Sequence, residues 1–244
     1  MRLIRVMCSG RVDMKYIFRA FLKGIDGVFI GACHLNECNY ITHGNYHALN
    51  MVLLSRRIME HIGMNPERLR INFMSGAEAN LFVEDVNDFV RTIKGIGPLG
   101  VSEGIEKNEL NSRLLKIYKL VPYFKLVNNE KLGTRLQNEE EYERFFTKDE
   151  IDKLFSEIAS YYIDPAKCQA CMTCARRCPA DAIISAKNQI HIVDQEKCIK
   201  CGTCFEVCPP KFRAVTKIVG APVPPPLPED QRTVVRKTKE KEVA

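Results

Sequence analysis

Eight cysteines toward the C-terminal end of the chain form two runs with the same spacing. Each run follows the pattern C-x2-C-x2-C-x3-C-P, and the second begins thirty residues after the first. The two runs comprise Cys168, Cys171, Cys174 and Cys178, then Cys198, Cys201, Cys204 and Cys208. Thiolates at this spacing ligate the irons of 4Fe–4S clusters. The pattern therefore predicts two cubane clusters and one-electron chemistry.

The spacing also predicts how the runs share the clusters, because the fourth cysteine of each run ligates the cluster of the other run. The first cluster is assigned Cys168, Cys171, Cys174 and Cys208, and the second is assigned Cys198, Cys201, Cys204 and Cys178. Zinc is the alternative metal for these cysteines, but structural zinc sites usually space their cysteine pairs more widely. Residues 162–216 resemble the two-cluster bacterial ferredoxin domain, with a short insertion at Pro209–Phe212, and the resemblance implies an α+β ferredoxin-like fold.

A smaller group of cysteines lies near the N-terminus. Two short apolar segments, Leu3–Met7 and Val28–Ile30, are predicted to be strands, and Cys8 and Cys33 follow them. Cys38 lies in the loop after Val28–Ile30. The carboxyl ends of parallel strands form the ligand-binding edge of an open sheet. We therefore expect the three thiols to converge as a metal site. The alternative is that they are small buried hydrophobic residues.

Several histidines lie close to these cysteines in sequence. His34, His43 and His47 are in or just after the same loop, and each taken singly is more typical of a loop or capping residue than of a ligand. His61 lies near the end of the following helix, where a cation is favoured, and we interpret it as structural.

The N-terminal part resembles the delta subunit of methyl-viologen-reducing hydrogenase, the hydrogenase iron–sulfur subunit family. The resemblance lies in Arg5–Asp13, in the segment 27–47 and in Pro66–Arg70, and it covers residues 1–100. It implies a 2Fe–2S cluster and electron transfer between a hydrogenase, or a substitute such as formate dehydrogenase, and the flavin subunit of heterodisulfide reductase. The ligands that it implies are Cys8, Cys33 and Cys38.

The chain departs from the family pattern in one respect. The family usually has a further strand, with further cysteines, upstream of the strand predicted at Leu3–Met7. A 2Fe–2S cluster held by thiolates needs four, and three are present. The alternatives are a truncated gene product, completion of the site by a histidine or by a partner protein, and an empty site.

The elements around these residues predict an α/β fold. Strands at Leu3–Met7, Val28–Ile30 and Leu69–Met74 alternate with helices at 13–23, 44–61 and 78–93. Strands separated by helices of this length favour a small parallel sheet between helical layers. We thus predict a three-layer N-terminal domain at 1–100.

The rest of the chain divides by composition. Residues 101–161 read as a helical linker, with one helix at 106–120 and a capping box from Thr147 to Glu150 that begins another. Residues 162–220 form the two-cluster ferredoxin domain. Residues 221–244 begin with five prolines in seven residues and end in mixed charge, which is typical of a disordered tail.

Composition excludes several classes of function. The 244-residue chain has a net charge of +6, which is weak support for nucleic acid, so we expect no nucleic-acid partner. We find no membrane-spanning run and no signal peptide, and we expect a cytoplasmic protein without membrane insertion. Eleven cysteines in such a protein favour metal over disulfides. We identify no catalytic residue. We also identify no flavin or nicotinamide site, because the glycine cluster Gly95–Gly100 follows a helix, whereas a dinucleotide-binding glycine loop follows a strand.

The sequence therefore predicts an electron-transfer subunit of a multi-subunit oxidoreductase of an anaerobe. One alternative is a ferredoxin whose N-terminal domain is a cluster-free docking adaptor. Another is an enzyme in which the N-terminal cysteines and a histidine form a catalytic metal site.

Overall fold

The computed structural model describes residues 1–40 and 43–234. The chain divides into two compact units, Met1–Leu154 and Phe155–Ala244. Each unit is described by itself below.

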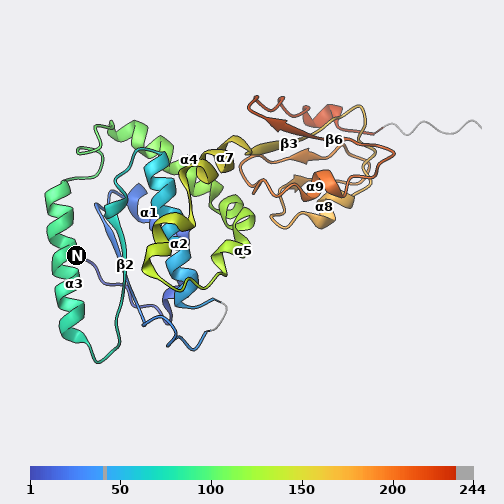
Figure 1. Cartoon of the computed structure of the whole chain (residues 1–244). Coiled ribbons are helices and arrows are strands. Elements are labelled where there is room, and N and C mark those ends of the chain that lie inside the picture. Colours follow the sequence, from blue (N-terminus) through green and yellow to red (C-terminus); the bar gives the residue numbers. More distant parts are fainter. Residues whose placement is uncertain (41–42, 235–244) are drawn as a thin grey trace, which may run out of the picture. The chain divides into compact units, whose positions relative to one another are not determined.

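A small parallel sheet lies at the centre of the first unit. Strand β1 (Val28–Ala32) pairs with β2 (Leu69–Phe73), in register from Val28 opposite Leu69 to Ala32 opposite Phe73. Figure 1 shows α3 (Ala79–Ile96) on one side of this sheet and α1 (Met14–Leu22) with α2 (Asn45–His61) on the other. The predicted α/β architecture with three layers is therefore confirmed.

The strand predicted at Leu3–Met7 is wrong. Residues 1–6 have no regular structure, and Leu3 and Ile4 are 76% and 83% exposed. An apolar run becomes a strand only where a neighbouring backbone pairs with it, and among the described residues β1 pairs with β2 alone. Cys8 instead precedes a single 3-10 turn, η1 (Ser9–Arg11).

Two helices begin at residues whose side chains cap them. The Asp13 carboxylate accepts a hydrogen bond of 2.8 Å from the backbone N–H of Lys15 at the start of α1. At α7 (Lys148–Ser156), Glu150 accepts from the Thr147 N–H at 2.9 Å, and the Thr147 hydroxyl accepts from the Glu150 N–H at 3.2 Å. The predicted capping box is confirmed.

The segment predicted as a linker contributes further helices to the first unit. These are α4 (Lys107–Val127), α5 (Asn129–Leu132), α6 (Tyr142–Phe145) and α7, with the 3-10 turn η3 (Glu139–Glu141). Buried Asn50 of α2 donates to the carbonyl oxygens of Lys131, Leu132 and Thr134 at 2.7–3.2 Å. Helix α5 is thereby held against α2.

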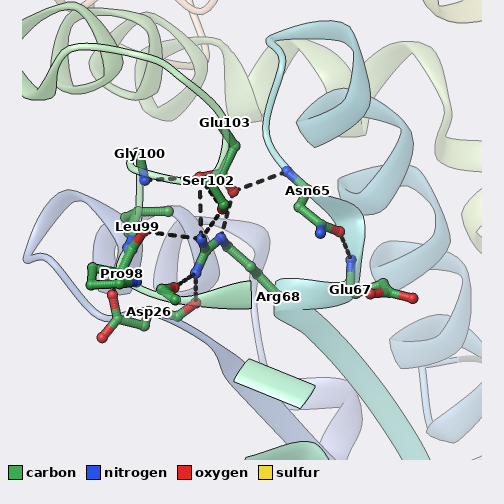
Figure 2. A network of polar contacts seen from close by, with 10 residues as sticks. Asp26, Asn65, Glu67, Arg68, Pro98, Leu99, Gly100, Ser102 and Glu103 are labelled. Atoms are coloured by element: carbon green, nitrogen blue, oxygen red, sulfur yellow. Dashed lines mark hydrogen bonds and ion pairs between the residues drawn. The ribbon is translucent and has the colours of Figure 1, made fainter. Parts of the chain in front are cut away.

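A buried guanidinium joins the loops at one end of the sheet. Arg68, at the end of the 3-10 turn η2 (Pro66–Arg68), has a side chain that is 0% exposed. It donates to the Glu103 carboxylate at 2.6 and 3.1 Å, to the Ser102 hydroxyl, and to the carbonyl oxygens of Asp26, Gly97 and Pro98 (Figure 2). One side chain thus fixes the loop before β1, the start of β2 and the end of α3.

Two antiparallel strand pairs and two short helices make up the second unit. Strand β3 (Ala159–Ile163) pairs with β6 (Val215–Val219), and β4 (Ile183–Ile184) pairs with β5 (Ile192–Val193). Helices α8 (Thr173–Arg177) and α9 (Thr203–Glu206) each begin one residue before the third cysteine of a run. This is the ferredoxin-like α+β arrangement expected from the sequence.

The proline-rich C-terminal segment is attached to the second unit. It includes the 3-10 turn η4 (Glu229–Gln231). The Ile190 N–H donates to the Arg232 carbonyl at 2.7 Å, and the Val234 N–H donates to the Asn188 carbonyl at 2.8 Å. The prediction of a tail without structure is therefore wrong up to Val234, because backbone hydrogen bonds to a distant segment hold it. Residues 235–244 of that predicted tail lie outside the described residues.

Within the described part of the chain, we find no helix with the length and apolar character needed to cross a membrane.

Candidate metal centres

The four cysteines assigned to the second cluster line one cavity. Its volume is about 300 Å³ including the opening to solvent, and Cys178, Cys198, Cys201 and Cys204 all face it. Cys178 comes from the first run, and it lines this cavity together with the first three cysteines of the second run. The remaining walls are mostly apolar, with contributions from Tyr161, Ala182, Ile183, Val193 and Ile199.

These thiols cannot all ionise without a cation. Burial raises the pKa of Cys204 to about 12, and the charges of Cys198 and Cys201 push it in the same direction. Burial also raises the pKa of Cys198. Four thiolates in one apolar cavity repel one another, and bound iron removes that cost because it neutralises their charge. The donor set therefore fits a cubane.

The first site is built in the same way. Cys168 and Cys174 are buried in the core of the unit, and Cys208 packs against that core. Burial raises the pKa of Cys174 to about 11, and the neighbouring Cys168 and Cys171 add to the rise. Three cysteines of the first run thus lie together, with the fourth cysteine of the second run in the same core.

Matching hydrogen bonds surround the two sites. Backbone N–H groups donate to the sulfurs of the fourth cysteines, from Ala182 to Cys178 at 3.2 Å and from Ala214 to Cys208 at 3.3 Å. Thr173 and Thr203 place their hydroxyl oxygens 3.5 and 3.3 Å from the sulfurs of Cys171 and Cys201. Donors of this kind orient cluster ligands and tune cluster potentials.

Among residues 1–40 and 43–234, no three histidine, cysteine, aspartate or glutamate side chains converge as they would around a single metal ion. A cubane has a different geometry, because its four thiolates bind four separate irons and stand farther apart.

The three N-terminal cysteines lie together, as the sequence predicts. The thiols of Cys8, Cys33 and Cys38 are close enough to affect one another's ionisation. Burial raises the pKa of Cys33, and Cys38 and Cys8 reinforce the rise. Burial would also raise the pKa of Cys38, but the backbone N–H groups of Tyr40 and Asn45 outweigh it and lower that pKa.

Two glycines allow the backbone to approach these thiols. A Cβ atom at Gly44 would lie 2.4 Å from the Cys38 sulfur, and one at Gly10 would lie 1.9 Å from the His43 carbonyl oxygen. Asn45, only 1% exposed, donates from Nδ2 to the carbonyl oxygens of Cys33 and His34 at 3.0 and 2.6 Å. The backbone around these thiols is therefore closely packed, and it brings together three thiols where a thiolate-held 2Fe–2S cluster needs four.

The same Asn45 Nδ2 lies 3.6 Å from the Cys33 sulfur. No role for Asn45 follows from the cysteine spacing or from any local motif. Its position directly after Gly44, at the start of α2, was the available signal.

The neighbouring histidines have other partners. His34 contacts Glu78 at 2.7 Å, and His47 Nδ1 contacts the Leu132 carbonyl at 3.1 Å. His43 lies beside His47, with ring centres 5.5 Å apart. His61 contacts Asp152 at 2.9 Å, in line with the structural role predicted for it.

Comparison with known proteins identifies both units separately. Residues 1–97 match the family model described as methyl-viologen-reducing hydrogenase, delta subunit, and residues 160–209 match the model described as 4Fe-4S dicluster domain.

Relatives of two kinds are similar to part of the chain. An iron-sulfur subunit of the F420-non-reducing hydrogenase of Archaeoglobus profundus is 41% identical over 97 residues, which are 40% of this chain and 70% of the relative. The vhu iron-sulfur subunit of the F420-non-reducing hydrogenase of Methanococcus maripaludis is 42% identical over 97 residues, 40% of this chain and 72% of the relative. One subunit of the ferredoxin/F(420)H(2)-dependent CoB-CoM heterodisulfide reductase of Methanosarcina acetivorans is 39% identical over 99 residues, 41% of this chain but only 12% of that protein.

Proposed function

Because the chain belongs to the methyl-viologen-reducing hydrogenase delta subunit family, we propose that it passes electrons between a hydrogenase, or another dehydrogenase such as formate dehydrogenase, and a flavin subunit of the heterodisulfide reductase type. The observation that carries the proposal is the cavity lined by Cys178, Cys198, Cys201 and Cys204. In one chain, a delta-subunit unit is joined to a unit built to hold iron–sulfur clusters. It works as an iron–sulfur electron carrier and not as a catalyst.

The proposed partners rest on the two kinds of relative. A similar segment occurs in a separate, short protein of the hydrogenase and as a 12% portion of a much longer protein of heterodisulfide reductase. A domain that occurs both alone and within a larger protein is a candidate for docking to that larger protein. We place the chain in the cytoplasm, where free thiols remain reduced.

In this proposal the second unit holds two 4Fe–4S clusters. Cys168, Cys171, Cys174 and Cys208 ligate the first, and Cys198, Cys201, Cys204 and Cys178 ligate the second. When bound, each cubane accepts and releases single electrons. The chain's own residues position the thiolates, exclude water through the apolar walls, and donate hydrogen bonds to the sulfurs.

The first unit holds a 2Fe–2S cluster at Cys8, Cys33 and Cys38. The Cys38 thiol is close enough to the other two to affect its pKa, and a fourth ligand completes the site. The competing proposal is that this unit is a docking adaptor without a cluster.

Iron and sulfide counts combined with EPR separate these proposals. The full chain is purified without oxygen, loaded with iron and sulfide, and reduced with dithionite. About ten irons per chain, with a 2Fe–2S signal beside cubane signals, are expected. Cys33→Ser should remove the 2Fe–2S signal. The control Cys171→Ser should reduce the cubane signals and leave the 2Fe–2S signal intact. About eight irons and cubane signals alone support the adaptor, and fewer in fully loaded protein contradict both proposals.

The partner is tested by rapid mixing. The dithionite-reduced chain is mixed with the oxidised flavin subunit of heterodisulfide reductase, and flavin absorbance is followed. The full chain should reduce the flavin at least tenfold faster than a two-cluster ferredoxin that lacks the first unit. Equal rates contradict the docking role of that unit.

A further inference from the structure

A buried histidine faces one of the cluster cysteines. His191 lies directly before β5 and is only 1% exposed. Its Nδ1 atom is 3.3 Å from the sulfur of Cys174, within hydrogen-bonding distance for sulfur. Its Nε2 atom has no hydrogen-bond partner in the described part of the chain. The ring therefore has one polar contact there, and that contact is to a ligand of the first site.

The chemistry of a ligated thiolate determines the direction of this hydrogen bond. A cysteine that binds iron has lost its proton, so its sulfur only accepts. An imidazole always carries a proton on at least one of its two ring nitrogens, so it can supply the donor that the sulfur needs. A lone pair on Nδ1 would repel the sulfur at this distance, so the proton resides on Nδ1.

The internal repeat offers a comparison within the same chain. Thirty residues before His191 stands Tyr161, as Cys168 stands thirty residues before Cys198. Tyr161 lines the cavity of the second site, and the nearby thiols of Cys204, Cys201 and Cys198 add to the burial that raises its pKa. Each half thus places one ring against one site, and the two rings differ in chemistry.

We propose that His191 donates a hydrogen bond from Nδ1 to the Cys174 sulfur and thereby raises the reduction potential of the first cluster above that of the second, where Tyr161 stands in its place. The inference rests on the proposed ligation of the first cluster by Cys174. Reduction adds negative charge to the cluster, and a donor aimed at a ligand sulfur stabilises the charged state. His191 is a positioning and tuning residue and carries no electron itself.

The surroundings strengthen this effect. A groove beside His191 is lined by Tyr162, Ile163 and Pro165 and by the C-terminal residues Val223, Pro224, Pro226 and Leu227. These walls are largely apolar. A hydrogen bond in such surroundings is stronger than one in water, because the local dielectric constant is low.

EPR-monitored redox titration of the fully loaded chain tests the proposal. His191→Phe keeps a ring of similar volume and excludes water, but has no donor. The reduction equilibrium of one cubane should become at least tenfold less favourable, which lowers its potential by about 59 mV for one electron. The potential of the other cubane should stay unchanged. His191→Asn, whose Nδ2 can take the place of Nδ1, should restore most of the loss.

The mirror variant Tyr161→His supplies a second measurement that does not depend on folding of His191→Phe. It should raise the potential of the other cubane, so the two variants must shift different signals. Unchanged potentials in both variants at full iron content overturn the inference and leave the proposed function intact. Wild-type chain that never binds two cubanes refutes the proposed function itself.

Discussion

Gly202 illustrates how a single residue adapts the fold to one site. It precedes α9 with a φ of +82°, and a Cβ atom there would lie 2.8 Å from the Tyr161 hydroxyl oxygen. Its counterpart in the first run, Met172, has a φ of +64° and carries a side chain. The ring at the matching place in that half belongs to His191, which has no hydroxyl group. The glycine therefore accommodates the larger ring.

We predict that Gly202→Ala destabilises the second unit by about 1–3 kcal/mol, because it adds left-handed strain and a clash with Tyr161. The measurement is the urea midpoint for loss of the visible cluster absorbance. Tyr161→Phe in the same chain should recover part of the loss by removing the clash. The matched control is Met172→Ala, which creates neither problem. Equal midpoints for Gly202→Ala and Met172→Ala would show that the close approach to Tyr161 does not affect the free energy of unfolding.

At this scale the cysteines were predictable and their neighbours were not. The spacing of the two runs is a covalent pattern that the folded unit preserves, so the cavity with Cys178 and Cys198 could be anticipated. His191 lies in no local motif, and only its distance of thirty residues from Tyr161 hints at a role. Asn45 likewise acts through the fold, because α2 brings its amide to the Cys33 backbone.

Among the elements, the loops that Arg68 joins depend on one buried ion pair. Removing one partner of such a pair typically costs about 3–5 kcal/mol, because the other charge stays buried. We predict a loss of this size for Arg68→Met, measured by urea unfolding with far-UV circular dichroism, to which the long helices of the first unit contribute most. Arg70→Met is the control, since Arg70 pairs with Asp88 at the surface and should cost less than about 1 kcal/mol. Similar losses for both variants would contradict the importance of burial.

The same pair predicts a pH dependence. Burial alone would raise the pKa of Glu103, but the hydrogen bonds and charge of Arg68, with the Asn65 N–H and the Ser102 hydroxyl, lower it to about 2. A carboxylate with a depressed folded pKa stabilises the fold above its ordinary value of 4.5 and loses that contribution as pH falls toward 2. The contribution amounts to about 3 kcal/mol at neutral pH.

Urea unfolding of wild type and Glu103→Gln between pH 7 and about 4 measures this contribution through the helical signal. The wild-type free energy of unfolding should fall with acidification more steeply than that of the variant, which has no carboxylate to protonate. Parallel curves would mean that Glu103 keeps an ordinary pKa in the folded chain.

Element boundaries show which local signals were sufficient. Caps at Asp13 and Thr147 act within a few residues, so the starts of α1 and α7 could be predicted. Helix α4 was predicted to end at Leu120 but continues through Pro122 to Val127, because Val121 and Phe124 are buried and packing outweighs the lost hydrogen bond. The Leu3–Met7 prediction failed for the opposite reason, since apolar residues without a pairing partner form no strand.

For the whole molecule, the two units differ in what fills their cores. The first is filled by long apolar side chains of its helices, including Phe18, Phe21, Leu54 and Phe124. The second has only two-stranded sheets among its described residues, and its buried core includes Cys168, Cys174 and Cys204. Isolated two-stranded sheets are marginal in water. The clusters must therefore supply much of the stability of the second unit, since metal binding to a site that exists only when folded adds directly to the folding free energy.

We predict that anaerobic removal of iron unfolds the second unit and leaves the first folded. Hydrogen exchange followed by mass spectrometry should lose protection in β3 and β6, while α2 and α4 keep theirs. Cys174→Ser should reproduce the loss in the second unit, and Cys33→Ser should leave both patterns unchanged because Cys33 is exposed. Protection of β3 that survives iron removal would mean that the polypeptide alone holds the ferredoxin unit. Loss in α2 as well would mean that the two units fold as one, and the clusters would then stabilise the whole chain.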